Sequence, residues 1–489
     1  MKKIVSLILG VLCVFGANAA QIANIEYVHK MIEHKWDITV PYNPALTDVK
    51  TIANMKYLLT AVDVANEILN GEKTTDYGNG GFATLQVADT IATNQAVETL
   101  VRKIDKGPEF TLTTTPDTKS FIFSISAAGE FVVDWGDGTV ETITKPDTTN
   151  TTYSHNYTTA GAYTISLGGQ ATAYNTSATT AAIAFSNPRN YQYAYNIASI
   201  DGSLGAIFGT LSSDTNNQPR FYRTFYDAYN MTGSIPANLF AGISGAPASS
   251  MFYYTFRGCS GLTGAIPDGL FAGISGAPAN HMFSGTFAAC SGLTSIPAGL
   301  FAGISGAPAS SMFDSTFDAC SGLTGAIPDG LFGNLTGAPA SNMFSGTFYG
   351  CSGLTSIPEN LFAGISGAPA ENMFSATFAA CSELTSIPDG LFAGISGAPA
   401  SHMFINTFGG CSKLTSIPEN LFGNISGTVK NGMFYNTFYN CTSLTGPSAR
   451  INGRYLYEIW PSAASSYVGD MYYNATGLSD YSSIPSDWK

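Results

Sequence analysis

The chain has few charged residues, and most of its charges are acidic. Only 11% of the 489 residues are charged, and 34 acidic against 21 basic residues give a formal net charge of -13. Between residues 221 and 446 there are four basic residues against ten acidic ones. Such a surface repels phosphate backbones, so the composition argues against nucleic acid as a partner.

Histidine is also scarce, and the arrangements typical of catalysis are missing. None of the five histidines lies in a His-Glu-x-x-His motif or beside a Gly-x-Ser-x-Gly elbow. His281 and His402 each directly precede a Met-Phe pair, where we expect exposure to solvent. An enzyme needs converging polar groups that occur once, so we predict a protein that is not an enzyme and has no cofactor or metal site.

Paired cysteine motifs are absent as well. Apart from Cys13 near the N-terminus there are seven cysteines, and no Cys-x-x-Cys pair occurs. They recur once per repeat of the sequence at one phase: Cys259, Cys290, Cys320, Cys351, Cys381, Cys411 and Cys441. Metal binding or redox chemistry is the functional alternative. We predict instead that these thiols are buried and unpaired, as small apolar side chains between repeats.

Long apolar runs are limited to the N-terminus. Lys2 and Lys3 precede an apolar run over residues 4–15, and Ala17-Asn18-Ala19 is a small-residue cleavage site. Residues 1–20 therefore read as a secretory signal peptide. No other run approaches the ~20 apolar residues of a membrane helix, so the mature chain is expected to lack a transmembrane segment. The predicted location is the cell surface or the extracellular space.

What the sequence does contain is a repeat over residues 221–446. A Met-Phe pair recurs with spacings of 31, 30, 31, 30, 30 and 30 residues, starting at Met251 and ending at Met433. The two longer units write Thr-Gly-Ala-Ile-Pro where the others write Thr-Ser-Ile-Pro. A fixed period of this length is typical of solenoids.

Each repeat suggests three local elements. Met282, Phe283, Phe287 and Cys290 lie close to one stripe of a helix, which predicts two helical turns. Residues 293–297 alternate apolar and polar, which predicts a short strand closed by proline. Residues 300–304 predict a second helical turn before a Gly-Ala-Pro loop. We therefore expect a multidomain chain whose main part is an α/β solenoid of short parallel strands and short helical turns.

The phrase Phe-x-x-Cys-Ser-x-Leu-Thr-Ser-Ile-Pro, followed by x-x-Leu-Phe, resembles the leucine-rich repeats of BspA-like bacterial surface proteins. The resemblance covers about half of the chain, and the motif recurs seven times. An inserted Gly-Ile-Ser-Gly-Ala-Pro-Ala loop departs from the shorter family repeat. The family resemblance implies surface exposure and adhesion to host or neighbouring-cell molecules.

Residues 108–169 form a separate module. Phe121–Ile125 and Phe131–Val133 read as strands, and Asp137-Gly138 is a hairpin turn signal. Trp-Gly-Asp-Gly, then His-x-Tyr, then Gly-x-Tyr-Thr-Ile resembles the PKD-like β-sandwich, an extracellular spacer. Asp134, Asp137 and His155 suggest a metal site, but we favour turn and core hydrogen bonds, since in that family these positions support the fold.

The remaining segments flank these two modules. Residues 21–107 read as a helical segment, either a hairpin or a short coiled-coil stalk. Their apolar seam, with Asn66 as a polar position, could support self-association through residues 52–69. Residues 170–220 are a join with an N-terminal cap, and within it residues 197–204 are a worn copy of the repeat. Residues 447–489 are expected to cap the C-terminal end, where Met471 to Asn474 echo the Met-Phe phrase.

Candidate ligand contacts are sought among the repeat positions that vary, because packing does not constrain them. Exposed aromatics among small residues are typical of protein or glycan contacts. The candidates are Tyr253, Tyr254, Arg257, Tyr349, Tyr435 and Tyr439. The leading hypothesis is a non-catalytic binding or adhesion protein for a host or neighbouring-cell protein or glycan. The alternative is a structural spacer or coat protein without a specific ligand, which the near-identity of the repeats favours.

Overall fold

A computed structural model of the chain describes residues 110–185, 194–211 and 217–489. The chain divides into two compact units, Met1–Gly107 and Pro108–Lys489, and the described residues belong to the second. The predicted signal peptide at 1–20 and the predicted helical segment at 21–107, with its seam at 52–69, lie outside the described residues.

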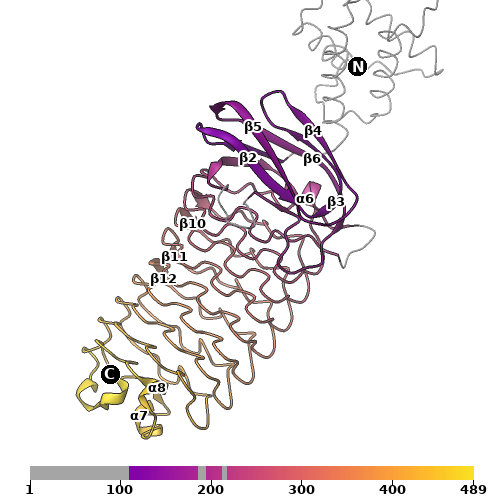
Figure 1. Cartoon of the computed structure of the whole chain (residues 1–489). Coiled ribbons are helices and arrows are strands. Elements are labelled where there is room, and N and C mark those ends of the chain that lie inside the picture. The colour runs from indigo at the N-terminus through magenta and orange to yellow at the C-terminus, as the bar shows by residue number, and fades with distance from the viewer. Residues whose placement is uncertain (1–109, 186–193, 212–216) are drawn as a thin grey trace, which may run out of the picture. The chain divides into compact units, whose positions relative to one another are not determined.

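The first part of the second unit consists of two antiparallel sheets (Figure 1). One sheet has the order β4-β3-β6-β1-β8 and the other has the order β5-β2-β7. Their strands are β1 Phe110–Thr114, β2 Thr118–Ile125, β3 Ala127–Asp134, β4 Val140–Lys145, β5 Thr151–Gly161, β6 Thr164–Tyr174, β7 Ile183–Ala184 and β8 Ile197–Gly202.

Alternation of apolar and polar residues explains strand β1. Along β1 every second side chain is buried, as expected for a strand with one face on a core. The two sheets meet through aromatic rings: Phe123 of β2 lies 5.6 Å from Trp135 behind β3, and Phe110 of β1 stacks on Phe185 behind β7 at 5.5 Å. The two strands predicted here are confirmed as parts of β2 and β3, and the predicted Asp137-Gly138 turn joins β3 to β4.

These sheets continue past residue 169, the predicted end of the module. Strand β8 pairs antiparallel with β1, which places it at one edge of the five-stranded sheet. The side of β8 that faces away from β1 meets the repeats, since the Thr232 N–H donates to the Ala198 carbonyl at 2.8 Å. We number the repeats from the unit that begins at Phe221, so the unit with Met251 is the second. The aromatic core is continuous between the sheets and the repeats, because Phe225 of the first repeat stacks on Phe185 at 5.4 Å. The worn repeat copy at 197–204 thus joins the sheets to the repeats.

The prediction of an α/β solenoid is wrong. Within the described residues there are only three α-helices, each of four residues, and the extended sheets are the antiparallel ones. The helices are α6 Leu204–Ile207, α7 Leu456–Ile459 and α8 Ser465–Val468, with 3-10 helices η2 Ala194–Asn196, η3 Tyr481–Ser483 and η4 Ser486–Trp488. None lies in the repeated phrase, where two helical turns per unit were expected.

The predicted strand of each repeat is also shorter than expected. Strands occur as two small parallel pairs, β9 with β10 and β11 with β12, and later repeats keep single hydrogen bonds such as Thr415 N–H to the Thr385 carbonyl at 3.2 Å. Their bounds are β9 Gly264–Ala265, β10 Leu293–Ser295, β11 Thr324–Ala326 and β12 Gly353–Ser356, and β13 Arg450–Ile451 and β14 Arg454–Tyr455 form a separate two-stranded antiparallel pair. Proline at the end of each segment cannot donate to a ladder, which keeps the strands short.

The Met-Phe segments are turns whose N–H groups alternate between two destinations. The Phe252 N–H donates to the Met282 carbonyl of the next repeat at 2.8 Å, whereas the Tyr253 N–H donates back to Ser250 at 3.2 Å. Tyr254 then donates to Ser284 at 3.0 Å, and Thr255 donates back to Phe252 at 3.2 Å. Since an α-helix needs every N–H to donate four residues back, this segment cannot be helical.

Left-handed residues at intervals of four make these turns possible. In the second repeat Ser250 has φ 56°, Tyr254 has φ 55° and Gly258 has φ 77°. The same phases elsewhere are filled mainly by Gly, Asn, Ser and Ala, and glycine and asparagine are the residues that tolerate this conformation best. The local sequence therefore carries a signal for repeated turns and against a helix.

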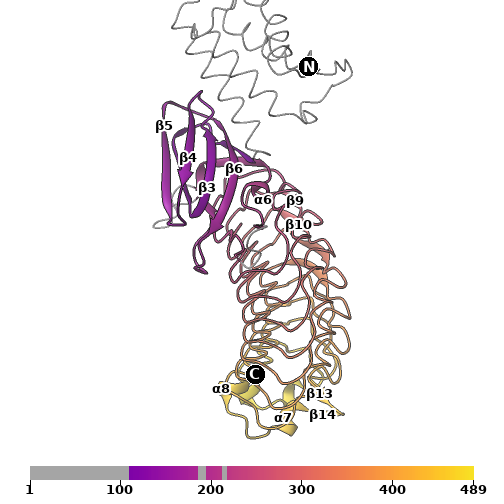
Figure 2. The same cartoon turned by 90° about the vertical axis from the view of Figure 1, so that its right-hand side faces the viewer.

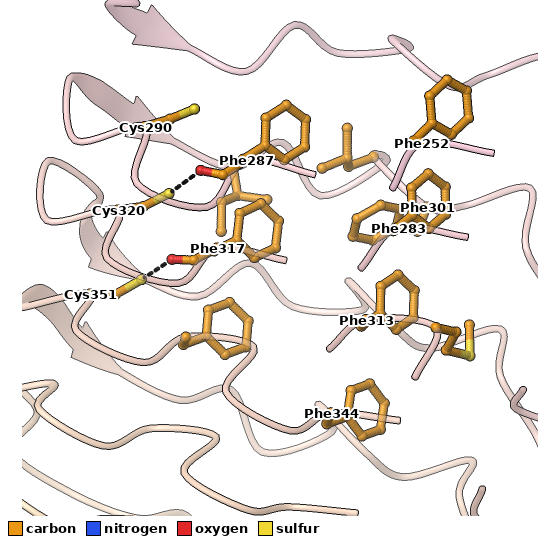
Figure 3. Close-up of a cluster of buried hydrophobic side chains, with 14 of the residues drawn as sticks. Phe252, Phe283, Phe287, Cys290, Phe301, Phe313, Phe317, Cys320, Phe344 and Cys351 are labelled. Carbon is orange, nitrogen blue, oxygen red and sulfur yellow. Dashed lines mark hydrogen bonds between the residues drawn. The ribbon is translucent and has the colours of Figure 1, made fainter. Parts of the chain in front are cut away.

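The fixed residues of the phrase bind one repeat to the next (Figure 3). The Cys320 Sγ donates to the Phe287 carbonyl of the preceding repeat at 3.0 Å, and Thr347 Oγ1 donates to the Phe313 carbonyl at 2.9 Å. Phenylalanine rings of equal phase stack from repeat to repeat, as Phe283 does on Phe313 at 5.7 Å. Figure 3 shows these rings in two columns beside the cysteines.

The last residues close the C-terminal end of the repeats (Figure 2). The Tyr472 N–H donates to the carbonyl of Trp488, which is buried within η4, at 3.0 Å. Ser448 binds the Asp480 carboxylate through its N–H at 2.8 Å and its hydroxyl at 2.6 Å. The alignment of Met471-Tyr472 with a Met-Phe pair is wrong, because Tyr472 stacks on Phe438 at 5.9 Å and so takes the Thr-Phe phase.

Exchange of glycine and alanine at the left-handed positions tests the turn geometry. Gly350 has φ 67° and Ala380, one repeat later at the same phase, has φ 58°. Gly350→Ala should lower the free energy of unfolding by about 1 kcal/mol, and Ala380→Gly should raise it by a similar amount, because alanine is strained at positive φ. Urea unfolding measures both. Ala379→Gly, at a buried neighbour without positive φ, should destabilise, and stabilisation there would refute this geometry.

Neighbouring residues on opposite faces test the packing. Phe348 is fully buried in a ring column, whereas Tyr349 is 43% exposed, as predicted from the fixed and variable phases. Phe348→Ala should cost about 3 to 5 kcal/mol of unfolding free energy because it leaves a cavity. Tyr349→Ala should change it by less than about 0.5 kcal/mol. Chemical unfolding of both variants measures the two free energies. A larger loss of stability for Tyr349→Ala than for Phe348→Ala would mean that the buried and exposed faces are assigned the wrong way round.

Candidate binding surface

The variable residues of each repeat are the two that follow the Met-Phe pair and the two that follow the Thr-Phe pair. Some of them are exposed, as Tyr349 is, and others are buried, as Ser284 and Ala288 are. Because repeats are joined in register, residues of equal phase lie above one another. Tyr222 and Tyr253 share one such phase, and their rings stack at 5.0 Å with an angle of 7°. A side chain that varies between repeats therefore meets its counterparts on the two neighbouring repeats.

Three of the six predicted contact residues come together in what we call the tyrosine–arginine cluster. It consists of the half-buried side chains of two adjacent repeats: Tyr222, Arg223, Tyr226, Tyr253, Tyr254 and Arg257. The Arg223 guanidinium carbon lies between 5.1 and 5.9 Å from all four tyrosine ring centres. Such contacts between a cation and aromatic faces stabilise the arrangement.

Arg257 completes the cluster from the second repeat. Its guanidinium carbon lies 5.3 Å from the Tyr226 ring centre and 5.4 Å from that of Tyr254. One of its nitrogens donates to the Tyr226 hydroxyl at 2.7 Å and lies 3.8 Å from an Asp227 carboxylate oxygen. The planar guanidinium can serve rings, a hydroxyl and a carboxylate together, which a lysine ammonium could not.

The other predicted residues lie elsewhere. Tyr439 stacks on Tyr473 at 4.9 Å near the C-terminal end, on the same repeat as Tyr435. Tyr349 is exposed on an intermediate repeat, flanked at its own phase by Asp318 and Ala379. The six candidates thus fall into three places, and only the first combines several rings with positive charge.

The sequence-based prediction missed half of the cluster. Tyr222, Arg223 and Tyr226 belong to the segment Phe-Tyr-Arg-Thr-Phe-Tyr-Asp-Ala, which lacks the Met of the phrase. Comparison of variable positions began at Met251 and therefore omitted this segment. Its Thr-Phe pair was a sufficient signal, since Thr224-Phe225 aligns it with Thr255-Phe256 and places Tyr226 on the phase of Arg257.

Charges in and around the cluster are balanced. Burial raises the pKa of Asp227, and the nearby Arg257 and Arg223 partly offset this effect. Burial likewise raises the pKa of Asp318, which lies within electrostatic reach of Arg257. Burial, with a contribution from Tyr254, raises the pKa of Tyr253 to about 12. The Tyr253 hydroxyl is therefore protonated at neutral pH, and two carboxylates lie within electrostatic reach of Arg257.

Residues with a possible metal or catalytic role are engaged otherwise. His155 Nε2 lies 2.8 Å from an Asp137 carboxylate oxygen, and Asp134 accepts from the Gly136 N–H at 3.0 Å. The second is a turn bond as predicted, whereas the first lies at the surface and not in the core. His281 is exposed as expected, but His402 is half-buried. In the ranges 110–185, 194–211 and 217–489, no three His, Cys, Asp or Glu side chains gather as a metal site would require. The same ranges hold no helix of a length and apolarity that would cross a bilayer.

The repeat cysteines are buried and unpaired, as predicted. Burial raises the pKa of each thiol from Cys290 to Cys441, to about 12 for Cys381 and Cys441. A thiol held in its protonated form is a poor nucleophile and a poor metal ligand. These side chains therefore serve the contact between repeats.

This burial predicts a loss of stability in mild base. Folded thiols keep their protons to about pH 12, whereas unfolded thiols release theirs near the ordinary value of 9.0. Below that pH the two states hold equal numbers of protons, and above it the unfolded state holds fewer. The free energy of unfolding should therefore fall as the pH rises through 9 toward 12. Urea unfolding at a series of pH values measures it, and Cys381→Ala should reduce the slope.

Comparison of the chain with models of protein families, with curated proteins and with solved structures found no match. The resemblance to BspA-like repeats and to PKD-like modules therefore stays a prediction from the residues that carry it.

Proposed function

We propose that this chain is an exported, non-catalytic binding protein whose repeats present the tyrosine–arginine cluster to a macromolecular ligand. The cluster itself is the observation that carries the proposal. Four tyrosines and two arginines occupy positions that the contact between repeats leaves free to vary, and every tyrosine ring centre lies within 6 Å of the Arg223 guanidinium carbon. Aromatic and arginine side chains are the residue types that dominate recognition surfaces.

The position of the charges supports this proposal. Arg223 and Arg257 are the only basic residues between positions 221 and 412, and both lie in the cluster. Arginines scattered for solubility would be spread along the repeats. Their concentration on two adjacent repeats is expected if this part of the surface meets a ligand.

The alternative is a spacer without a ligand, which the near-identity of the Gly-Ile-Ser-Gly-Ala-Pro-Ala loops favours. These loops have a structural task that accounts for their constancy. The Gly276 N–H donates to the Gly303 carbonyl at 2.9 Å, and the Ser305 N–H donates back to Gly276 at 2.9 Å. Constancy in the loops is therefore compatible with a binding role for the turns. The signal peptide predicted at residues 1–20 supports export under either proposal.

A binding screen with matched variants tests the proposal. The purified full chain is offered extracellular proteins and glycans, and each binder is measured again with Tyr254→Ala combined with Arg257→Ala. Affinity should fall at least tenfold, because both side chains belong to the cluster. Tyr349→Ala, an exposed tyrosine outside the cluster, should retain the affinity. Unchanged affinity of the double variant would show that the ligand binds outside the cluster. Absence of any binder would favour a spacer without a ligand.

A further inference from the structure

The rings of the cluster are held in place before any ligand arrives. A Cβ atom at Gly285 of the next repeat would lie 2.0 Å from two ring carbons of Tyr254, so this ring lies directly across the glycine. Gly285 also has φ 58°. Tyr254 additionally lies 4.2 Å from the Tyr253 ring centre. A surface already in its binding geometry loses less conformational entropy when a ligand binds.

The cluster offers a mixture of groups around its rings. Phenol hydroxyls both donate and accept hydrogen bonds, guanidinium groups donate, and the Asp227 carboxylate accepts. Arg257 lies 3.8 Å from an Asp227 carboxylate oxygen, Arg223 is also within electrostatic reach of Asp227, and Asp318 is within reach of Arg257, so these carboxylates offset positive charge in the cluster. The whole chain carries a net charge of -13, which repels a polyanion. The favoured ligand is therefore uncharged and rich in hydroxyl groups.

A protein partner fits less well. A stable protein interface needs a core of apolar side chains. Within the described residues the exposed large hydrophobic side chains are four tyrosines, Tyr195, Tyr229, Tyr349 and Tyr473. In the repeat beside the cluster, Ser284, Gly285 and Ala288 are small and buried. An apolar core of the required size is missing beside the cluster.

Resting on the proposed function, we infer that the tyrosine–arginine cluster is a subsite for a neutral glycan. The weakly polar C–H face of a sugar ring packs against tyrosine, a contact that aromatic side chains with a polar tip suit well. The sugar hydroxyls exchange hydrogen bonds with Arg257, Asp227 and the phenol groups around the rings. Because the ligand is neutral, its binding depends little on salt, in contrast to binding through unpaired charges.

Two glycine variants provide a matched test. Gly285→Ala would force the Tyr254 ring aside. Gly346→Ala places alanine at the same phase two repeats later, at φ 57°, where the nearest atom is the Ser315 hydroxyl oxygen at 3.2 Å. Both changes carry the same backbone strain, but only the first disturbs the cluster. Tyr254→Phe, which keeps the ring, serves as a variant with less effect on folding.

Binding is measured by affinity electrophoresis and calorimetry with the full chain, using soluble glucans, mannans, galactans and xylans, with polygalacturonate as the acidic comparison. At least one neutral polymer should bind, with equal affinity at 50 and 500 mM salt. Gly285→Ala should weaken this binding at least tenfold and Gly346→Ala less than twofold, with both variants folded by circular dichroism. Tyr254→Phe should weaken it less than Tyr254→Ala.

The outcomes separate this inference from the proposed function. Binding to polygalacturonate alone, or glycan binding that weakens steeply with salt, would overturn the inference of a neutral glycan. The proposed binding function would still stand. A protein ligand lost on Gly285→Ala, without any glycan bound, would do the same. Equal effects of the two glycine variants on glycan binding would place the glycan elsewhere. No binding to proteins or glycans would overturn both proposals.

Discussion

Every second N–H of the repeated turns donates to a carbonyl of the following repeat, and most of the structure depends on this one pattern. The remaining N–H groups donate to the carbonyl three residues back and close four-residue β-turns, which leaves no run of bonds for an α-helix. From Phe221 to Phe408, the phenylalanine carbonyls of the two phases represented by Phe313 and Phe287 close turns and also accept from a threonine or cysteine side chain of the next repeat. Buried backbone groups are thereby satisfied without long helices or strands.

The same pattern decides where a ligand can be held. Met, Phe, Thr and Cys are committed to the contact between repeats, so variation is confined to the pairs of residues that follow Met-Phe and Thr-Phe. Because adjacent repeats are hydrogen-bonded in register, their variable residues lie about as far apart as two stacked rings. The ring centres of Tyr222 and Tyr253, for example, are 5.0 Å apart. Two adjacent repeats with unusual residues at these positions are sufficient to build a cluster from side chains 31 residues apart.

The sequence correctly predicts much of which residues are buried, but it wrongly predicts helical turns in the repeats. The burial of Cys351 and the strands that contain Phe123 and Val132 follow from the spacing of residues along the chain, because such patterns report local structure and burial well. The helical turns were inferred from apolar residues at Met282, Phe283, Phe287 and Cys290, which omits Thr286. With threonine included the period is four residues and not 3.6, and Gly285 and Ala289 mark the left-handed positions. For the cluster, aromatic variation identified Tyr253, Tyr254 and Arg257 but not the preceding repeat.

By itself the sequence determined the repeat period, the inward phases, the burial of the unpaired cysteines and the strands of the antiparallel module, because each depends on spacing along one segment. Only the tertiary structure decided that the turns are left-handed at every fourth residue, that β8 links the sheets to the repeats, and that Arg223 lies among four tyrosine rings. Those features depend on which backbone group of one repeat meets which group of the next, and local propensity does not contain that pairing.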